Sequence, residues 1–259
     1  MDLQLEGKRA LVSGSTAGIG FAIASALAAE GAIVIVNGRT REAVDKARTA
    51  IPGLVEGFAG DLSKAETAEA LVARHPDIDI LVNNLGIFEP KPFEDIPDAD
   101  WLRFFDVNVL SGVRLARLCL PAMRRQNWGR IIFISSESGI QIPAEMIHYG
   151  MTKSAQIAVA RGLAEAVAGT GITVNSVLPG PTRSRGVEDF VEALAQNEGK
   201  SFAEFEQEFF EKVRPSSLIK RFATPEEVAH LVAYVASPLS SATSGAALRV
   251  DGGVVRAAF

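Results

Sequence analysis

Short apolar stretches alternate with longer amphipathic ones along most of this chain. The apolar stretches are nearly continuous in valine, isoleucine and leucine, a pattern typical of β-strands that are covered on both faces. They predict strands at Arg9–Ser13, Ile33–Val36, Ile78–Val82, Arg130–Ser135, Thr173–Val177 and Ala247–Val250, with a weaker candidate at Leu54–Phe58. The amphipathic stretches predict helices at Ile19–Glu30, Ala65–Arg74, Val107–Gln126 and Met151–Ala168. Repeated strand–helix–strand units of this kind favour a parallel sheet with helices on both sides.

The C-terminal part contains a marked helix start and one segment that departs from this pattern. Thr224 is followed by a proline and two glutamates, which predicts a capped helix beginning at Pro225. Before it, residues 183–218 form an insert that holds five phenylalanines: Phe190, Phe202, Phe205, Phe209 and Phe210. The spacing of three of them, at 202, 205 and 209, predicts an amphipathic helix. It is either an ordinary surface helix or a lid over a substrate pocket. We favour the lid, because the insert follows the carboxyl end of a strand.

Length and composition fit one α/β domain over residues 1–259, with 47% hydrophobic and 22% charged residues. A net charge of −5 argues against nucleic acid or an anionic membrane as the main partner. No apolar run approaches the ~20 residues that span a bilayer, and we see no signal peptide, so we expect a cytoplasmic protein. We expect Cys119 to be a small buried apolar residue. The three histidines are scattered, so no metal site is expected.

A glycine-rich turn joins the first predicted strand to the first predicted helix. Residues 9–20 read RALVSGSTAGIG, with glycines at positions 14, 18 and 20. Glycines permit a tight turn and let the main chain approach a diphosphate, and the helix N-terminus then offers free N–H groups. The spacing is neither the common dinucleotide fingerprint nor a P-loop. Its place in the first strand-to-helix turn nevertheless indicates a nucleotide site.

Polar residues also follow the third and fourth strands. Asp61, in the tripeptide GDL, suits an adenine amino group, but with Leu62 and Ser63 it also suits a helix cap. Asn84, in the run NNLG, can stabilise the adjoining turn, contact a ligand, or do both.

The end of the second strand bears on the choice of cofactor. An NAD enzyme usually places an acid there, roughly ~20 residues beyond the glycine loop, to bind the ribose 2′-hydroxyl. Here Gly38 occupies that place and Arg39 follows, and a guanidinium suits a 2′-phosphate. Asn37 could add a neutral hydrogen bond. We therefore predict NADP(H), with NAD(H) as the alternative. Against this stand a glycine loop without a basic residue, since position 17 is alanine, and the possibility of a solvent-facing Arg39 or a substitute role for Arg41.

Tyr149 and Lys153 are four residues apart, so on one helix they would lie a single turn from each other. A nearby ammonium lowers the pKa of a phenol from its ordinary value of ~10, and such a tyrosine can exchange a proton near neutral pH. Most pairs with this spacing are solvated neighbours. Two further features favour chemistry: Ser136 ends a buried strand, and Asn108 is a polar residue within an apolar helix.

Together these features resemble the short-chain dehydrogenase/reductase family, the single-domain type of about this length. The resemblance covers nearly the whole chain and rests on SGSTAGIG, GDL, NNLG, VNV, SSESG, YGMTK, PGPT and VDGG, in this order. It implies a doubly wound Rossmann fold with a mostly parallel seven-stranded sheet and helices on both faces. It also implies hydride transfer between a nicotinamide cofactor and a carbonyl or secondary alcohol. The 3-oxoacyl-[acyl-carrier-protein] reductases are similar members.

The resemblance also implies roles for individual residues. Tyr149 is the acid/base, Lys153 lowers its pKa and binds the nicotinamide ribose, and Ser136 hydrogen-bonds the substrate oxygen. Asn108 positions a water that links Lys153 to solvent. Besides Tyr149, Lys153 and the candidates Asn37, Arg39, Asp61 and Leu62, the cofactor-binding residues are Gly14, Ser15, Thr16, Gly18, Ile19, Gly20, Asn84, Gly86, Pro179, Gly180 and Thr182.

Partners are less closely defined by the sequence. The phenylalanines of the insert and its excess of acids favour an uncharged or apolar substrate. A 3-oxoacyl thioester reductase is the alternative, with Arg124 and Arg125 as a patch for an acidic carrier protein, although arginines at a helix end are also ordinary dipole partners. A non-catalytic dinucleotide-binding regulatory protein would be expected to lack part of the catalytic set, which is complete here. The family resemblance and two long apolar-rich helices predict a homotetramer.

Overall fold

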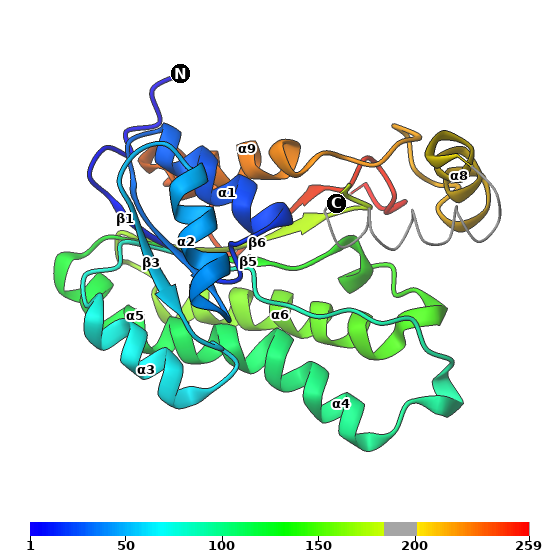
Figure 1. Ribbon diagram of the computed structural model, residues 1–259, viewed down its shortest axis with the longest axis horizontal. Coiled ribbons are helices and arrows are strands. Elements are labelled where there is room, and N and C mark those ends of the chain that lie inside the picture. Colours follow the sequence, from blue (N-terminus) through cyan, green and yellow to red (C-terminus); the bar gives the residue numbers. More distant parts are fainter. Residues whose placement is uncertain (184–200, 259) are drawn as a thin grey trace.

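The computed structural model describes residues 1–183 and 201–258. Its strands form one seven-stranded sheet in the order β3-β2-β1-β4-β5-β6-β7 (Figure 1). All neighbouring strands are parallel. The strands are β1 (Arg9–Val12), β2 (Ile33–Gly38), β3 (Val55–Ala59), β4 (Ile80–Asn83), β5 (Gly129–Ile134), β6 (Ile172–Pro179) and β7 (Ala247–Val250). The predicted doubly wound fold is confirmed, including the weaker strand β3. Its strand order reverses between β1 and β4, where such sheets bind ligands at the carboxyl edge.

Helices cover both faces of the sheet (Figure 1). One face carries α1 (Gly18–Ala29), α2 (Arg41–Ala50) and α9 (Pro225–Ala236), and the other carries α3 (Ala65–Arg74), α4 (Asp98–Phe105), α5 (Ser111–Gln126) and α6 (Ile147–Ala166). The short helix α8 (Phe202–Glu208) lies beyond the carboxyl ends of the strands. Turns of 3-10 helix occupy Phe93–Asp95, Glu137–Gly139, Ala144–Met146 and Pro238–Ser240, and π-helical turns occupy Asp106–Leu110 and Phe209–Val213.

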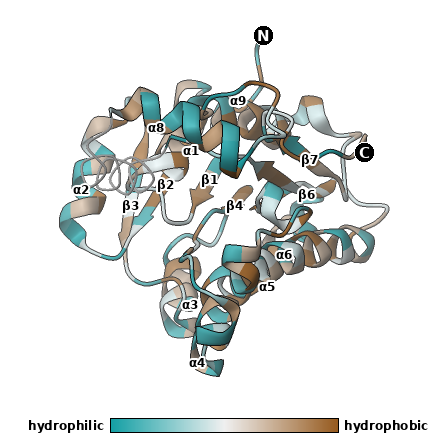
Figure 2. Ribbon diagram, turned by 90° about the vertical axis from the view of Figure 1, so that its right-hand side faces the viewer, coloured by the Kyte–Doolittle hydropathy of each residue, from teal (hydrophilic) through white to brown (hydrophobic). Residues whose placement is uncertain are grey.

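Each face of the sheet has its own apolar core. Successive strand residues point to opposite faces, so Val12 joins the core beneath α1 and α9 whereas Leu11 joins the core beneath α3, α5 and α6. This double covering explains the continuous apolar strands, which are brown in the interior of Figure 2. Cys119 lies in the second core, and burial raises the pKa of its thiol to about 12. The prediction of an inert buried cysteine is therefore confirmed.

Two helix starts differ from the prediction in ways that affect the site. Helix α6 begins at Ile147, four residues before the predicted start at Met151, and therefore includes Tyr149. The predicted helix over Val107–Gln126 is regular only from Ser111, because the turn before it is π-helical. A π-helical turn holds one extra residue per turn, and this one contains Asn108.

The insert contains the predicted amphipathic helix. Ser201 caps α8, and Glu204 completes a capping box by accepting a hydrogen bond from the Ser201 main chain at 2.8 Å. Phenylalanine rings of α8 and of the π-helical turn after it pack around Phe222, which precedes α9: Phe202, Phe205, Phe209 and Phe210. Phe190 lies outside the described residues. Thr224 caps α9 as predicted, with Pro225 at its first position.

Within residues 1–183 and 201–258, every helix is too short or too polar to cross a bilayer. The same ranges hold no group of three or more histidine, cysteine, aspartate and glutamate side chains placed to bind a metal ion.

Candidate active site

A cavity of about 540 Å³ opens at the carboxyl edge of the sheet, beside the point where the strand order reverses. It brings together predicted site residues from motifs far apart in the chain: Ile19, Asn84, Gly86, Ser136, Tyr149, Lys153, Pro179, Gly180 and Thr182. Most of its other walls are apolar: Ile87, Phe88 and Pro90 come from the segment after β4, Met146 from the turn before α6, Phe205, Phe209 and Val213 from the insert, and Phe222 from the segment before α9. The structure thus places a catalytic set and an apolar enclosure in one site.

The glycine loop presents an uncapped helix end to this region. Helix α1 starts at Gly18, with a φ of +56° that favours glycine, and its N-cap residue Ala17 makes no side-chain capping bond. The first turn of α1 contains no acid. A Cβ atom at Gly20 would lie 2.5 Å from both Asn84 Nδ2 and Gly14 O, so a side chain does not fit there. These free N–H groups and this close packing fit a dinucleotide pyrophosphate.

Two of the predicted cofactor contacts instead hold this loop from within. The Ser15 hydroxyl is fully buried, donates to Val12 O at 2.7 Å and accepts from Asn37 N at 2.9 Å. The Asn37 side chain is 2% exposed. It accepts from Gly14 N at 3.1 Å and donates to Phe58 O and Gly60 O at 3.1 and 3.0 Å. These side chains connect β1, β2 and β3 beneath the loop. Their hydrogen-bonding atoms are already engaged by groups of the protein itself.

Asn84 stabilises the adjoining turn, and its contact with a ligand stays a prediction. Its amide donates to Ser13 O and Gly14 O, each at 3.0 Å. Asn84 also lines the cavity. Ser13, which replaces the usual threonine of the family, keeps the hydroxyl that this arrangement needs. Ser13 Oγ accepts from the main-chain N–H groups of Asn84 and Leu85, each at 3.0 Å.

The ends of β2 and β3 form the expected adenosine side of the site. Asp61 Oδ1 accepts from Ser63 N at 3.0 Å. Burial raises the pKa of Asp61, but hydrogen bonds from Ser63 and the charges of Lys64 and Arg39 outweigh it and hold that pKa below its ordinary value. Leu62 is buried in the core, so its side chain is not available to a ligand. Arg39 is exposed, and β2 ends without a carboxylate.

Helix α6 holds Tyr149 and Lys153 together, as the spacing predicts, but with a different electrostatic result. Lys153 Nζ donates to Ile134 O at 3.0 Å and lies 5.5 Å from the centre of the Tyr149 ring. Burial lowers the pKa of Lys153 to about 8, although the charge of Glu137 acts in the opposite direction. Burial also raises the pKa of Tyr149, and the charge of Glu137 raises it further. The predicted lowering of the tyrosine pKa is therefore not found, because burial and the charge of Glu137 outweigh the hydrogen bond with Ser136.

The serine motif after β5 separates into distinct roles. Ser135 Oγ donates to Lys153 O at 2.8 Å and so ties β5 to α6. Ser136 Oγ accepts from Ser138 N at 3.1 Å and donates to Glu137 Oε2 at 2.5 Å. A hydrogen bond between Ser136 and Tyr149 opposes the rise in the tyrosine pKa. These contacts place Ser136, rather than Ser135, against the tyrosine.

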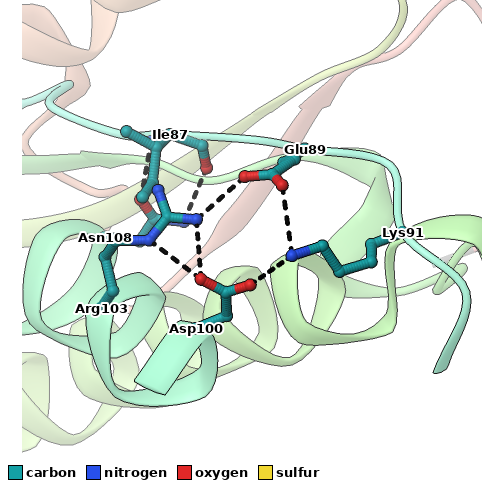
Figure 3. Close-up of polar contacts among 6 residues, drawn as sticks. All are labelled: Ile87, Glu89, Lys91, Asp100, Arg103 and Asn108. Carbon is teal, nitrogen blue, oxygen red and sulfur yellow. Dashed lines mark hydrogen bonds and ion pairs between the residues drawn. The ribbon is translucent and has the colours of Figure 1, made fainter. Parts of the chain in front are cut away.

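Asn108 fastens the segment after β4 to α6. Its Oδ1 accepts from Ile87 N at 2.8 Å, and its Nδ2 donates to Ile87 O at 3.0 Å (Figure 3). The same Nδ2 also donates to Thr152 Oγ1 at 2.9 Å. A Cβ atom at Gly86 would lie 3.5 Å from both Asn108 Oδ1 and Lys153 Nζ, so the two polar groups flank this glycine. Asn108 is thus close to Lys153, and its role in a water relay remains a prediction.

An ionic network extends this fastening along the next few residues (Figure 3). Lys91 contacts Glu89 at 3.4 Å and Asp100 at 2.5 Å, and Arg103 contacts the same two carboxylates at 2.9 and 3.0 Å. The network joins the segment after β4 to α4. That segment carries Phe88, whose ring meets the Tyr149 ring edge-on with centroids 6.4 Å apart. The ionic network therefore fixes the part of the cavity wall that carries Phe88 and lies beside Tyr149.

Comparisons with known proteins agree with the fold and with the family resemblance. The family described as enoyl-(acyl carrier protein) reductase matches residues 14–255. The uncharacterized oxidoreductase YvaG of Bacillus subtilis is 50% identical over 100% of both chains. The D-beta-hydroxybutyrate dehydrogenase of Cupriavidus necator is 37% identical over 97% of this chain and 99% of its own. The L-sorbose reductase of Gluconobacter frateurii, solved with NADPH and L-sorbose, superposes with a TM-score of 0.93 at 29% identity, covering 99% of this chain and 100% of its own.

The chain belongs to the short-chain dehydrogenase/reductase family. It is an NAD(P)-dependent oxidoreductase, as the resemblance of its motifs predicted.

Two residues of this short-chain dehydrogenase/reductase were missed as site residues from sequence. Glu137 and Arg214 both line the cavity, and their charged groups approach to 3.6 Å. Glu137 carried a usable signal, because a carboxyl group one residue after a buried strand and beside a candidate serine needs a partner. Arg214 carried none, since it lies among many charged residues of the insert.

Proposed function

We propose that this short-chain dehydrogenase/reductase transfers a hydride between NADP(H) and the carbonyl or secondary alcohol of a small, uncharged or largely apolar molecule. The observation that carries the proposal is the shared cavity of Ser136, Tyr149 and Lys153, which adjoins the uncapped start of α1. The nicotinamide cofactor, when bound, supplies or accepts the hydride. The chain's own residues supply orientation and the proton.

Tyr149 acts at its hydroxyl, which gives a proton to the carbonyl oxygen in reduction and takes one from the alcohol in oxidation. The Ser136 hydroxyl hydrogen-bonds the same substrate oxygen and so fixes it beside the tyrosine. Lys153 holds the nicotinamide ribose, and its charge favours the phenolate form of Tyr149. Asn108 keeps the segment after β4 in place and positions a water near Lys153.

The cofactor would lie along the carboxyl edge of the sheet. The main chain around Gly14, Thr16, Gly18, Ile19 and Gly20 would hold the pyrophosphate. Asp61, Asn84 and Gly86 would flank the adenosine side, while Pro179, Gly180 and Thr182 would hold the nicotinamide end. A Cβ atom at Gly180 would lie 2.6 Å from Asp251 O, which brings the VDGG motif against this end of the site. Over the cavity, α8 and the turn after it act as the lid.

The proposed function is tested by following NADPH absorbance at 340 nm with a panel of aldehydes and ketones. We expect steady oxidation of NADPH that depends on the carbonyl compound. Tight NADPH binding with no turnover of any carbonyl or alcohol would instead support the non-catalytic regulatory protein. The experiment therefore separates turnover from binding alone.

A 3-oxoacyl thioester reductase is the second candidate, because an arginine-rich groove lies between α5 and α6. Arg117, Arg124 and Arg125 line it together with apolar residues such as Leu120 and Leu163. A FabG reductase of Aquifex aeolicus is 32% identical over 98% of this chain. Arg124, however, also donates to Ala166 O at 3.2 Å at the end of α6. A kcat/KM for an acyl-carrier-protein thioester far above that for simple ketones would favour this candidate.

We expect NADPH to be used with a higher kcat/KM than NADH. No carboxylate at the end of β2 would repel a 2′-phosphate, and the exposed Arg39 guanidinium is placed there to bind one. Reversing the preference requires an acid at position 38, but a Cβ atom there would lie 2.4 Å from Thr16 Cγ2. The appropriate variant is therefore Thr16→Ser with Gly38→Asp and Arg39→Leu, because serine removes the obstructing methyl group.

Arg41 provides the comparison for this test. Its side chain is exposed and lies 3.7 Å from Asp45, so Arg41→Leu removes the same charge two residues further on. We expect Arg39→Leu to weaken NADPH binding more than Arg41→Leu does. A wild-type NADPH/NADH ratio of kcat/KM at or below one would refute the NADP preference and leave the catalytic roles unaffected.

The protein should assemble as a homotetramer, with α5 and α6 forming one of the contacts between copies. The groove between these helices has an apolar floor of Val113, Ala116, Leu120, Val159 and Leu163, which a symmetric pair of helices would cover. Light scattering at micromolar concentration should give four times the chain mass. Leu120→Glu should shift the mass downward, whereas the monomer mass in the wild type would refute the assembly and leave the groove open to a carrier protein.

A further inference from the structure

Glu137 brings a carboxyl group into the wall of the active-site cavity, directly beside Ser136. It lies in the 3-10 turn after β5 and is only 6% exposed. Its Oε2 accepts the hydrogen bond from Ser136 Oγ at 2.5 Å. Burial raises the pKa of Glu137, which reflects the free-energy cost of holding a carboxylate there. Hydrogen bonds from Ser136 and Ser138 and the charge of Arg214 act against this rise.

The guanidinium of Arg214 faces Glu137 from the insert. Its side chain is 13% exposed, and its Nε lies 3.6 Å from Glu137 Oε1, which is too far for a direct hydrogen bond. On its other side, Arg214 Nη1 donates to Glu145 Oε1 at 3.2 Å. An acceptor and a donor thus stand opposite each other in the cavity wall without bonding directly.

Charge decides what kind of group suits this place. Two carboxylates, Glu137 and Glu145, surround one guanidinium, so the cluster carries an excess negative charge that disfavours an anionic substrate. Lys153, the other cation lining the cavity, is turned toward Ile134 O and Tyr149. A neutral hydroxyl can donate to one member of the pair and accept from the other, which satisfies both. The neighbouring rings of Phe88, Phe205 and Phe209 offer such a substrate only apolar contacts.

We propose that Glu137 and Arg214 form a subsite for a neutral hydroxyl group, so that hydroxy ketones and the matching diols are the preferred substrates. The inference rests on the proposed function, in which Ser136 and Tyr149 hold the carbonyl oxygen. Because Glu137 adjoins Ser136 in the chain and bonds to it, the hydroxyl lies one or two carbons from the carbonyl carbon. The hydroxyl donates to Glu137 Oε1 and accepts from Arg214. Both residues determine specificity.

The test compares ketones that differ only by a hydroxyl in place of a methyl group. The pairs are 1-hydroxy-2-butanone with 3-pentanone, and 4-hydroxy-2-butanone with 2-pentanone, each reduced with NADPH. The measured quantity is the ratio of kcat/KM within a pair, for wild type and for Glu137→Leu, Glu137→Gln and Arg214→Met. Comparing ratios between variants cancels the inherent reactivity of each ketone and any common effect on Ser136.

We expect Glu137→Leu to lower the ratio by about 10- to 100-fold in at least one pair, since a hydrogen bond to a charged group is lost. Glu137→Gln should lower it less, because the amide oxygen still accepts. Arg214→Met should also lower the ratio. This variant tests the subsite independently if Glu137→Leu fails to fold. The control is Glu211→Gln, which removes a negative charge from an exposed residue of the same insert that does not line the cavity. It should leave the ratio unchanged.

Four results would overturn the subsite. If Glu137→Leu and Arg214→Met both keep the wild-type ratio of kcat/KM within each pair, neither residue binds the hydroxyl. A higher kcat/KM for 2-oxobutanoate than for 1-hydroxy-2-butanone would show that Arg214 serves a carboxylate instead. Reduction of plain ketones without turnover of any hydroxy ketone would overturn the subsite but leave the proposed function intact. Absence of turnover across the whole carbonyl panel would overturn both.

Discussion

Tyr149→Phe should fold normally, bind the cofactor and lose about 10²- to 10⁴-fold in kcat, the range for removal of a positioned acid. The substitution removes only the hydroxyl that we assign to proton transfer. The ring remains to pack edge-on against Phe88, so the cavity wall should keep its shape. Steady-state kinetics at 340 nm measures the loss, and NADPH fluorescence measures retained cofactor binding.

Tyr234→Phe is the matched control. The sequence contains two tyrosines, and Tyr234 lies on α9 with 40% of its surface exposed, away from the lining of the cavity. It should keep wild-type activity. If the Tyr149→Phe enzyme retains more than a tenth of wild-type kcat, the assignment of Tyr149 as the acid/base is wrong.

Lys153→Met should weaken cofactor binding by about 10- to 100-fold, because a charged hydrogen-bond donor is replaced by a side chain of similar length without one. Turnover should also fall, since the same ammonium is assigned to favour the phenolate of Tyr149. The wild-type residue is 5% exposed and donates to Ile134 O, so its place in the site is well defined. Fluorescence titration with NADPH and a pH–rate profile measure the two effects separately.

The pH dependence of cofactor binding follows from the direction of the Lys153 pKa shift. Burial lowers the pKa of Lys153 to about 8, so the wild type should lose the ammonium, and with it cofactor affinity, as the pH rises through that value. Lys153→Met should bind weakly at every pH and lack this step. The fall of kcat/KM above that pH should therefore be absent from the Lys153→Met enzyme.

Lys46→Met, at an exposed position of α2, is the control for loss of one positive charge, and it should bind NADPH like the wild type. Lys153→Arg keeps its positive charge at every pH, because a guanidinium does not titrate in this range, so it should also lack the loss of cofactor affinity near pH 8. An unchanged basic limb in a weakened Lys153→Met enzyme would contradict the electrostatic role.

Much of the fold follows from patterns that extend over only a few residues. Most strands are visible in the sequence because they are covered on both faces and therefore nearly continuously apolar, whereas the edge strand β3 is only partly buried and gives the weaker signal. The capped start at Thr224-Pro225 and the glycine turn before α1 are equally local. By contrast, α2 and α4 were not predicted. The first buries only Val44 and Ala47 and the second only Phe104, so neither carries a broad apolar stripe.

The catalytic pair shows where local reasoning is sufficient and where it fails. Residues four apart on one helix share a face whatever surrounds them, so Tyr149 and Lys153 are neighbours by sequence alone. The direction of their pKa shifts depends on burial and on Glu137, which only the packed structure supplies. The Tyr–Lys spacing therefore predicted the contact but predicted the wrong direction for the tyrosine.

What the sequence by itself determined is the order of strands and helices, the nucleotide loop and the residues of the catalytic motifs, because each depends on the spacing of nearby residues. Only the tertiary structure decided that Ser15 and Asn37 hold the loop from within, and that Glu137 meets Arg214 beside Ser136. The reason is physical: these contacts join side chains far apart in the chain. Whether a polar group turns to a ligand or to the protein depends on which partners the packed core brings within hydrogen-bonding distance.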